Sequence, residues 1–196
     1  RACCTERVMP SIGSVSVPSR SNSRCRYFFV IVLNLLSETP LGSGVSSYSP
    51  EKTREMAALL REWKVPLTIH QPAYNMLNRW IEKDLLGTTD ELGAGVIAFT
   101  PLAQGLLTDK YLKGIPEDAR VNRPGGGSLK AEHLSDANIE HVRALNEIAK
   151  RRGQSLAQLA LSWALRDARV SSVLIGASRP EQIADNVAAM QGAPLS

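Results

Sequence analysis

The stretch that decides the fold is SSVLIGASRPEQIADNVAAM, residues 171–190. Its first part, 171–175, predicts a buried strand that ends at Gly176. Residues 179–181, Arg-Pro-Glu, then favour a helix start, because proline fits the first turn and glutamate complements the helix dipole. Three apolar side chains follow at helical spacing and are expected to face inward: Ile183, Val187 and Met190. The stretch therefore predicts one strand–loop–helix unit of an α/β protein.

The same alternation runs back through the chain. Strands are predicted at 67–69 and 96–99, and helices begin at 50, at 78 (ending at 86), at 135 and at 155. The helix from residue 50 has a capping serine before it and four apolar positions: Met56, Leu59, Leu60 and Trp63. Alternating strands and helices indicate a parallel sheet with helices outside it. No G-x-G-x-x-G follows a strand and no Walker motif occurs, so neither of those nucleotide-binding motifs is predicted.

Composition places the chain among ordinary globular proteins. Of its 196 residues 43% are hydrophobic, which supports a sizeable core, while only 5% are aromatic, which disfavours a base-stacking RNA binder. The net charge of +4 is uneven: residues 1–40 carry five arginines and two acidic residues, whereas the other 156 carry 18 basic and 17 acidic residues. A nearly neutral body gives no reason to expect nucleic acid as a partner.

The first 40 residues differ in character from the rest. They hold all three cysteines, Cys3, Cys4 and Cys25, at spacings that match no zinc site, so we expect a reducing, cytoplasmic setting and no metal. The apolar run at 27–36 is ten residues long, too short to cross a bilayer as a helix. We interpret it as a buried or artefactual segment and expect neither a targeting function nor a membrane partner.

Polar or aromatic side chains follow each predicted strand. These segments are SSYS at 46–49, HQPAYN at 70–75, FTPLAQG at 99–105 and GASR at 176–179. In a parallel β/α barrel the chemistry lies where strands end and loops begin. The long stretch at 100–130 has little periodicity, and loops of this length are usually functional.

Four motifs in this order resemble one family. GVSSYSP at 44–50, QPAYNMLNR at 71–79, AFTPLAQGLLTDKY at 98–111 and SVLIGASRPEQIADN at 172–186 resemble the last four strand ends of the aldo-keto reductase barrel. The similar branch contains bacterial glyceraldehyde-3-phosphate reductases and potassium-channel β subunits. The resemblance implies an α/β fold, a partial (β/α)8 TIM barrel of about the last four β/α units. Residues 44–196 would form this C-terminal half, and residues 1–43 an unrelated, poorly structured arm.

The resemblance also implies NADP(H), extended across the C-terminal mouth of the barrel. Ser46 and Gln71 match positions that hold the nicotinamide carboxamide, and Phe99 matches the aromatic residue that stacks on the nicotinamide. Nine further matched positions lie along the pyrophosphate and the adenosine end: Thr100, Pro101, Leu102, Gln104, Lys110, Arg120, Ser178, Gln182 and Asn186. Arg179 joins this set because, with Ser178, it lies at a predicted helix N-terminus, where anions bind readily.

Each residue also has a plainer interpretation. Phe99 could belong to the core, Lys110 and Arg120 could be solvated loop charges, and Ser46 and Gln71 could satisfy buried backbone groups. The co-occurrence of four motifs favours the cofactor interpretation for this set. It does not extend to the histidines, which are expected in the core, in a loop and on a helix surface: His70, His133 and His141 respectively.

The sequence departs from the family in its first part. Hydride transfer in the family uses an Asp, Tyr, Lys and His tetrad after the second to fourth strands, and residues 1–40 do not resemble that region, so no catalytic residue is assigned. A full barrel typically needs about 250 residues, whereas residues 44–190 supply 147. Two functions stay open. One is NADPH-dependent reduction of aldehydes and small ketones in the parent family, with this chain keeping mainly the cofactor-binding half. The other is a non-catalytic NADP(H)-binding regulatory module.

The expected partners follow from the family resemblance and from the incomplete barrel. The parent family takes a small carbonyl substrate. An open parallel half-sheet leaves two unpaired edges, so we expect homo-oligomers, aggregation or marginal stability. The alternative is that the YFFVIVL segment, residues 27–33, pairs as an extra strand on an open edge.

Overall fold

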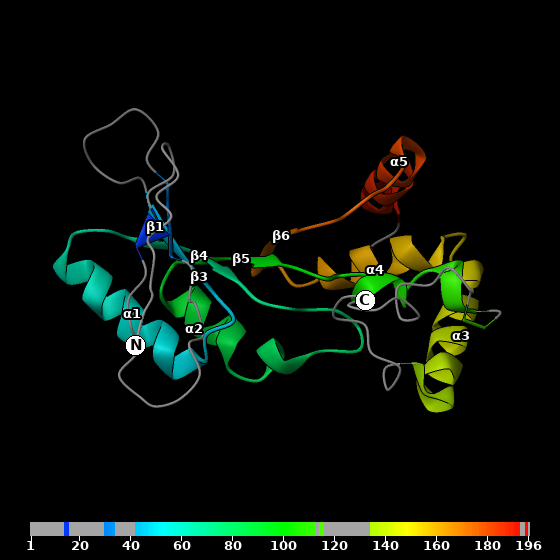
Figure 1. The fold of residues 1–196 in the computed structure, drawn as a ribbon, viewed down its shortest axis with the longest axis horizontal. Coiled ribbons are helices and arrows are strands. Elements are labelled where there is room, and N and C mark those ends of the chain that lie inside the picture. Colours follow the sequence, from blue (N-terminus) through cyan, green and yellow to red (C-terminus); the bar gives the residue numbers. More distant parts are fainter. Residues whose placement is uncertain are drawn as a thin grey trace, which may run out of the picture. The chain divides into compact units, whose positions relative to one another are not determined.

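The computed structural model describes residues 14–15, 30–33, 42–112, 114–115, 134–192 and 195 (Figure 1). They fall into two units. The first combines the residues up to Pro72 with Ile81–Ile97, and the second joins Ala73–Trp80 to the residues from Ala98 onward.

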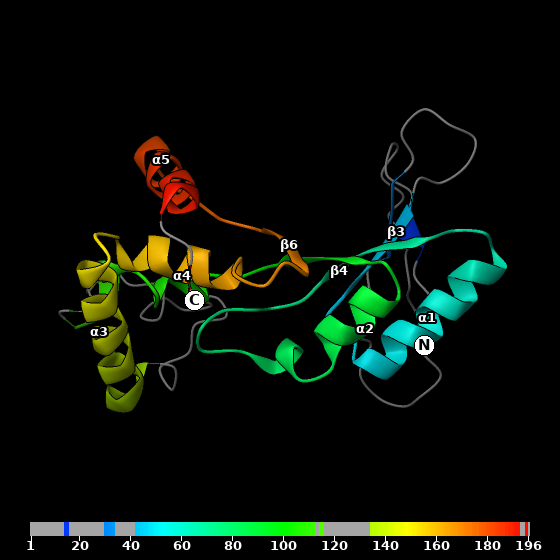
Figure 2. The same ribbon diagram turned by 180° about the vertical axis from the view of Figure 1, so that it is seen from behind.

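The first unit is built on parallel strands. β3 (Gly42–Ser46) pairs with β4 (Leu67–Gln71), and β4 pairs with β5 (Gly95–Ala98), both in parallel. α1 (Pro50–Glu62) and α2 (Leu85–Glu91) follow β3 and β4 and lie on the same side of the strands (Figures 1 and 2). One core cluster fills this interface: Val45, Tyr48, Met56, Ala57, Leu60, Leu67 and Ala94.

α1 begins where its sequence predicts. The Ser49 hydroxyl accepts a hydrogen bond from the amide of Lys52, and Pro50 occupies the first turn. Of the predicted apolar face, Met56 and Leu60 are buried. Leu59 and Trp63, which share the helical spacing, are instead 47% and 65% exposed. The buried face of α1 is therefore narrower than its set of apolar residues at helical spacing.

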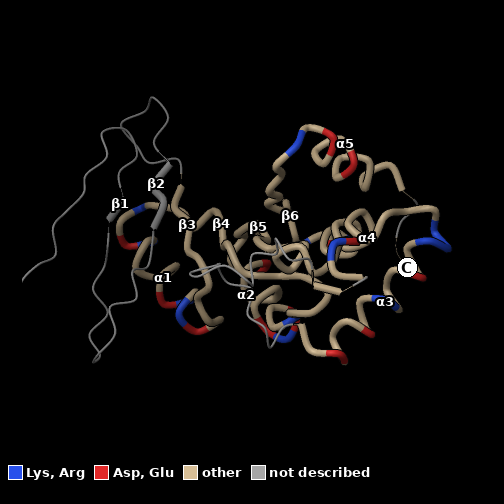
Figure 3. Tube along the Cα trace, turned by 45° about the vertical axis from the view of Figure 1, so that its right-hand side comes forward, with Lys and Arg blue, Asp and Glu red and all other residues tan. Residues whose placement is uncertain are grey.

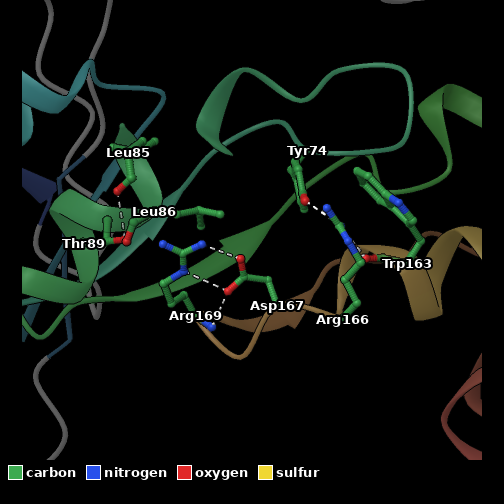
Figure 4. Close-up of polar contacts among 8 residues, drawn as sticks. All are labelled: Tyr74, Leu85, Leu86, Thr89, Trp163, Arg166, Asp167 and Arg169. Carbon is green, nitrogen blue, oxygen red and sulfur yellow. Dashed lines mark hydrogen bonds and ion pairs between the residues drawn. The ribbon is translucent and has the colours of Figure 1, made fainter. Parts of the chain in front are cut away.

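The second helix starts later than predicted. The range 78–86 holds only a 3-10 turn, η1 (Trp80–Glu82), and α2 begins at Leu85. α2 contains Gly87 and two threonines, which are poor helix formers. Both threonine hydroxyls donate to carbonyls of the preceding turn; Thr89 bonds those of Leu85 and Leu86 (Figure 4). This helix is therefore stabilised by burial more than by propensity.

One edge of β3 has a partner strand. β1 (Ser14–Val15) pairs antiparallel with β2 (Val30–Leu33), and β2 pairs antiparallel with β3. The extra-strand alternative therefore describes this edge, and the expectation of two unpaired edges was wrong. Glycine is required at position 42 of β3, because a Cβ there would overlap the Thr68 side chain on β4.

The second unit is mainly helical. It contains η2 (Ala103–Gly105), η3 (Asp109–Tyr111), α3 (Asp136–Arg151), α4 (Leu156–Ala164), β6 (Val170–Val173), α5 (Pro180–Ala188) and η6 (Ala189–Gln191). Its core is Leu106, Leu107, Tyr111, Leu134, Ile139, Val142, Leu156 and Ala160. Serine caps start α3 and α4, and Ser155 forms a full capping box with Gln158. Four parallel strands alternating with helices confirm the predicted α/β class.

α5 forms where predicted but its apolar stripe is not covered. Ile183, Val187 and Met190 are 51%, 56% and 67% exposed, so the inward prediction was wrong for all three. The buried residues of this segment are instead Asn186 on α5 and Ala189 at the start of η6. No helix in the part of the chain described is both long and apolar enough to span a membrane.

Candidate cofactor-binding site

A cavity of about 890 Å³ lies within the second unit. Its walls are the loop after β5, η3, the segment after β6 and the first turns of α5. Nine of the thirteen predicted cofactor residues line it: Thr100, Pro101, Leu102, Gln104, Lys110, Ser178, Arg179, Gln182 and Asn186. Residues from two separate motifs, at 98–111 and 172–186, thus meet at one cavity.

The loop that follows β5 has a strained backbone. Thr100, Ala103 and Gln104 have φ values of 55°, 47° and 60°, in the left-handed region that non-glycine residues avoid. For Thr100 the cost is greatest, because its side chain is β-branched. Strain of this kind persists where the surrounding structure fixes it, and it clusters at ligand sites.

Asn75 fixes this loop, although it is not among the site residues predicted from the sequence motifs. Its side-chain amide donates a 2.9 Å hydrogen bond to the carbonyl of Thr100. Its Oδ1 accepts from the amides of Leu77 and Asn78, at 3.0 and 2.9 Å, which locks the Asn75 side chain in place. Asn75 is only 4% exposed. Its position directly after a strand, in QPAYN, was the available signal, because asparagine in such turns bonds backbone groups.

The N-terminus of α5 gathers three donors on one oxygen. The Oε1 atom of Gln182 accepts from the Ser178 amide at 2.8 Å, the Ser178 hydroxyl at 3.2 Å and the Arg179 amide at 3.3 Å. Donors that converge on one acceptor at a helix N-terminus also suit a phosphate oxygen. Gln182 would have to turn away for such an oxygen to take its place.

Charges of both signs line the cavity. Lys110 and Arg179 are exposed cations, and Figure 3 shows basic colour directly before α5 and acidic colour within it. The acid Asp185 is held by α4: its carboxylate accepts from the Ser155 hydroxyl at 3.1 Å and from the Gln158 side-chain amide at 2.7 Å. These bonds fix α5 on α4 and satisfy the carboxylate. Lys110 and Arg179 are the cations that an anion in the cavity would meet, while Asp109 and Glu181 add negative charge to the same lining.

Three of the other predicted residues, Ser46, Gln71 and Phe99, lie outside the cavity lining. Ser46 and Gln71 are neighbours in the first unit, where they are register partners on β3 and β4 and the Ser46 hydroxyl donates to the Gln71 carbonyl at 2.8 Å. Phe99, in the second unit, is half-buried, and its carbonyl accepts from the amide of Tyr74 at 3.2 Å. Arg120 falls outside the described residues, as does the Gly125–Gly127 run.

His70 belongs to the core of the first unit, as expected. It is fully buried, and neither ring nitrogen has a hydrogen-bond partner among the described residues. Burial lowers its pKa to about 4; the nearby backbone of Tyr48, which makes no well-formed hydrogen bond, opposes this more weakly. His141 is exposed on α3, and His133 is not described. Among the described residues no group of three or more His, Cys, Asp or Glu is placed to hold a metal.

Comparisons with known proteins agree with these motifs. Residues 42–196 match the model of the Aldo/keto reductase family. The chain is 59% identical over 156 residues to L-glyceraldehyde 3-phosphate reductase of Escherichia coli, which covers 78% of this chain and 45% of that protein. It is 36% identical to a probable voltage-gated potassium channel subunit beta of Oryza sativa, covering 78% and 47%.

A solved structure supports the partial barrel. The glycerol dehydrogenase of Gluconobacter oxydans superimposes with a TM-score of 0.60 at 30% identity, over 78% of this chain and 44% of that one. The chain thus spans about half the length of the relatives it matches. Because the family model covers well over half of the residues and the similarity extends to the fold, the chain belongs to the aldo/keto reductase family.

Proposed function

We propose that this chain binds NADP(H) in the second-unit cavity and supplies the cofactor-binding half of a reductase that acts on aldehydes and small ketones. The observation that carries the proposal is the convergence of nine predicted cofactor residues, from two motifs, on one cavity. The 59% identity to a reductase of a phosphorylated aldehyde supports the same class of reaction.

The α5 N-terminus supports the phosphate end of the proposal. Ser178 and Arg179 already direct three donors at the Gln182 oxygen, an arrangement that fits a 2′-phosphate oxygen. Lys110 and Arg179 would supply the charge that such a phosphate needs. Charge-assisted hydrogen bonds of this type contribute about 1.5–3 kcal/mol each. NADP(H) should therefore bind more tightly than NAD(H).

Ser46 and Gln71, in the first unit, match family positions that hold a nicotinamide carboxamide, and their chemistry suits an amide. When bound, the cofactor supplies the hydride that reduces a carbonyl carbon. The Ser46 hydroxyl donates its proton to the Gln71 carbonyl, so the Ser46 oxygen is still able to accept from a carboxamide N–H. The Gln71 side chain can both donate and accept a hydrogen bond. We assign no general acid to residues 42–196, since the matched motifs contain none of the family's tetrad.

The second candidate is a non-catalytic NADP(H)-binding module. The 36% identity to a probable potassium-channel β subunit favours it, together with the unassigned general acid. In this alternative the nucleotide is a ligand whose redox state is sensed. The cavity and its residues would be the same, so only turnover separates the two candidates.

Two measurements on the full chain test the proposal. Calorimetric titration should give tighter binding of NADPH than of NADH; equal affinities would contradict the assignment of the phosphate site. NADPH oxidation with methylglyoxal or glyceraldehyde should be no faster for the chain alone than for its Phe99→Ala, Lys110→Ala variant. Clear turnover above that control would refute the claim that the chain lacks its catalytic acid.

A further inference from the structure

The QPAYNMLNR motif at 71–79 contributes no residue to the lining of the cavity described above. Two of its side chains instead meet the end of α4. Tyr74 tilts against the Trp163 ring, with ring centroids 5.2 Å apart, and the guanidinium carbon of Arg79 lies 5.3 Å from the same Trp163 centroid. The guanidinium carbon of Arg166 is closer, at 3.8 Å (Figure 4). Two guanidinium groups therefore share one indole, and we call Arg79, Trp163 and Arg166 the arginine–tryptophan cluster.

This cluster brings two like charges together. The guanidinium carbons of Arg79 and Arg166 can be no further apart than the two distances, 5.3 and 3.8 Å, that join them to the same centroid. Exposed like charges repel when they lie within about one Debye length, ~8 Å in physiological salt. The neighbouring acid, Asp167, is held by Arg169, whose Nε and Nη2 atoms donate to its two oxygens at 2.9 and 2.6 Å. These four side chains together carry a net charge of +2.

The Arg166 side chain is held in a fixed orientation. Its Nη1 atom donates 2.8 Å hydrogen bonds to the Tyr74 hydroxyl and to the Trp163 carbonyl. Tyr74 is fully buried, so its hydroxyl is a rigid acceptor. A guanidinium carries five N–H groups in one plane, which suits bidentate contact with a carboxylate. Because this group is already oriented on an aromatic ring, it loses little conformational freedom when it binds an anion.

The composition of this surface is that of a protein contact. Arg79 and Arg166 are exposed, and neither they nor Trp163 line the cavity. Leu77 and Trp80, from the same segment as Arg79, are 38% and 40% exposed. Arginine and tryptophan dominate the binding energy of many protein–protein interfaces, whereas small molecules usually bind in concave sites. Charge complementarity requires that the partner carry carboxylates here.

We propose that the arginine–tryptophan cluster docks an acidic segment of a partner protein, whose carboxylates bind the guanidinium groups of Arg79 and Arg166 beside Trp163. This binding site goes beyond the proposed function. No residue of the cluster belongs to the cavity lining, so docking can be measured with the cation pair of the cavity removed.

The test therefore uses the full chain with Lys110→Ala and Arg179→Ala, which removes the two cavity cations. Fluorescein-labelled hexaglutamate is titrated at low salt, and binding is measured by fluorescence polarisation. We expect saturable binding that weakens as salt is added. Adding Arg79→Gln and Arg166→Gln should lower the affinity at least about tenfold, because charge-assisted hydrogen bonds to both guanidinium groups are lost.

A matched control makes the same change in charge elsewhere. Lys150→Gln with Arg151→Gln, at exposed positions on α3, should leave the affinity within about twofold. Two single variants serve if the double variant at the cluster does not fold, as judged by urea unfolding. Arg79→Gln leaves the bond between Arg166 and Tyr74 in place and should still weaken binding. Arg166→Lys keeps the charge but not the planar fork, so it should also bind less tightly than the parent.

Four outcomes would overturn the inference. Hexaglutamate might fail to bind at all, or both double variants might weaken its binding equally, which would show attraction to overall charge only. Tripolyphosphate that binds as tightly as the peptide and displaces it would assign the cluster to small polyanions. Self-association of the parent in sedimentation velocity that Arg79→Gln abolishes would assign it to a second copy of the chain. NADPH titration of the chain with its cavity cations intact is a separate measurement, so failure of docking and failure of cofactor binding can be told apart.

Discussion

Arg166 donates a 2.8 Å hydrogen bond to the hydroxyl of Tyr74, a residue 92 positions earlier in the chain. Its guanidinium carbon also lies 3.8 Å from the centroid of the Trp163 ring, and its Nη1 atom also donates to the Trp163 carbonyl at 2.8 Å (Figure 4). Tyr74 is fully buried and tilts against the same tryptophan, with ring centroids 5.2 Å apart. Arg166 thus ties the segment after β4 to the end of α4.

Replacing Arg166 should destabilise the second unit. Arg166→Ala leaves the buried Tyr74 hydroxyl without this donor and removes the stacking on Trp163, so we expect a loss of about 1–3 kcal/mol in the free energy of unfolding, measured in urea. Arg54→Ala is the control: its partner is Glu91, and both side chains are more than half exposed, so it should cost under about 1 kcal/mol. Equal losses would contradict a special contribution from Arg166.

His70 should make stability depend on pH. The unfolded side chain binds its proton near pH 6.5, whereas the buried one binds it only near 4. Between these values the unfolded state holds more protons, so stability is fully present above pH 6.5 and falls as the pH drops toward 4. The slope should approach about 1.4 kcal/mol per pH unit. Unfolding free energies measured across this window test it.

Two variants isolate that slope. His70→Asn removes the titrating group and should flatten the pH dependence whatever its own effect on stability. His141→Asn, at an exposed position on α3, should keep the full slope. Asp167 titrates in a different window, because the hydrogen bond from Arg169 lowers its pKa to about 2. A slope retained in His70→Asn would mean that another group is responsible.

The elements that could be predicted from sequence are those with local signals. Ser49 and Ser155 cap helix starts through their own side chains. The alternation of predicted strands and helices indicates the α/β class. α2 was misplaced because Thr88 and Thr89 carry no helix signal, and only their burial makes that segment helical. The inward assignment of Val187 failed for a different reason: helical spacing defines an apolar face but not whether another element covers it.

Asn75 should control the cavity loop from outside the cavity. Asn75→Ala removes the bond to the Thr100 carbonyl and two acceptor bonds, so the strained turn at Thr100 loses its support. We expect a loss of about 1–3 kcal/mol in unfolding free energy together with weaker NADPH binding. Asn78→Ala is the matched control, because the hydrogen bonds described for Asn78 use its backbone only. Unchanged NADPH affinity in a folded Asn75→Ala protein would contradict the role.

Gln182→Glu should move stability and affinity in opposite directions. A carboxylate at this position keeps the three donors from Ser178 and Arg179 and gains from the α5 helix dipole, so stability should rise by about 0.3–1 kcal/mol. The same charge would repel a phosphate, so NADPH affinity should fall about tenfold or more. Gln191→Glu, exposed on η6, should change neither quantity. Thermal unfolding and calorimetric titration give the two readouts, and parallel changes would contradict the assignment.

Part of the site could also be predicted from the sequence, because local motifs mark several of its residues. Lys110, Ser178 and Gln182 were selected by their motifs, and the structure brings them to one cavity. The motifs do not show how these residues interact. They do not predict that the Gln182 side chain accepts hydrogen bonds from Ser178 and Arg179, or that the Asn75 side chain donates to the Thr100 carbonyl. Those bonds join residues through turns whose conformations depend on tertiary packing.

The central claim is that Lys110 and Arg179 recognise the cofactor phosphates in this cavity. Calorimetric titration of NADPH into Lys110→Ala, Arg179→Ala and into the matched control Lys150→Ala, Arg151→Ala, at low and moderate salt, tests it most directly. The account predicts an affinity loss of roughly tenfold to a few hundredfold for the first protein, smaller at the higher salt, and none for the control on α3. Equal affinity in the two double variants, or a parent protein that binds NADH as tightly as NADPH, would contradict it.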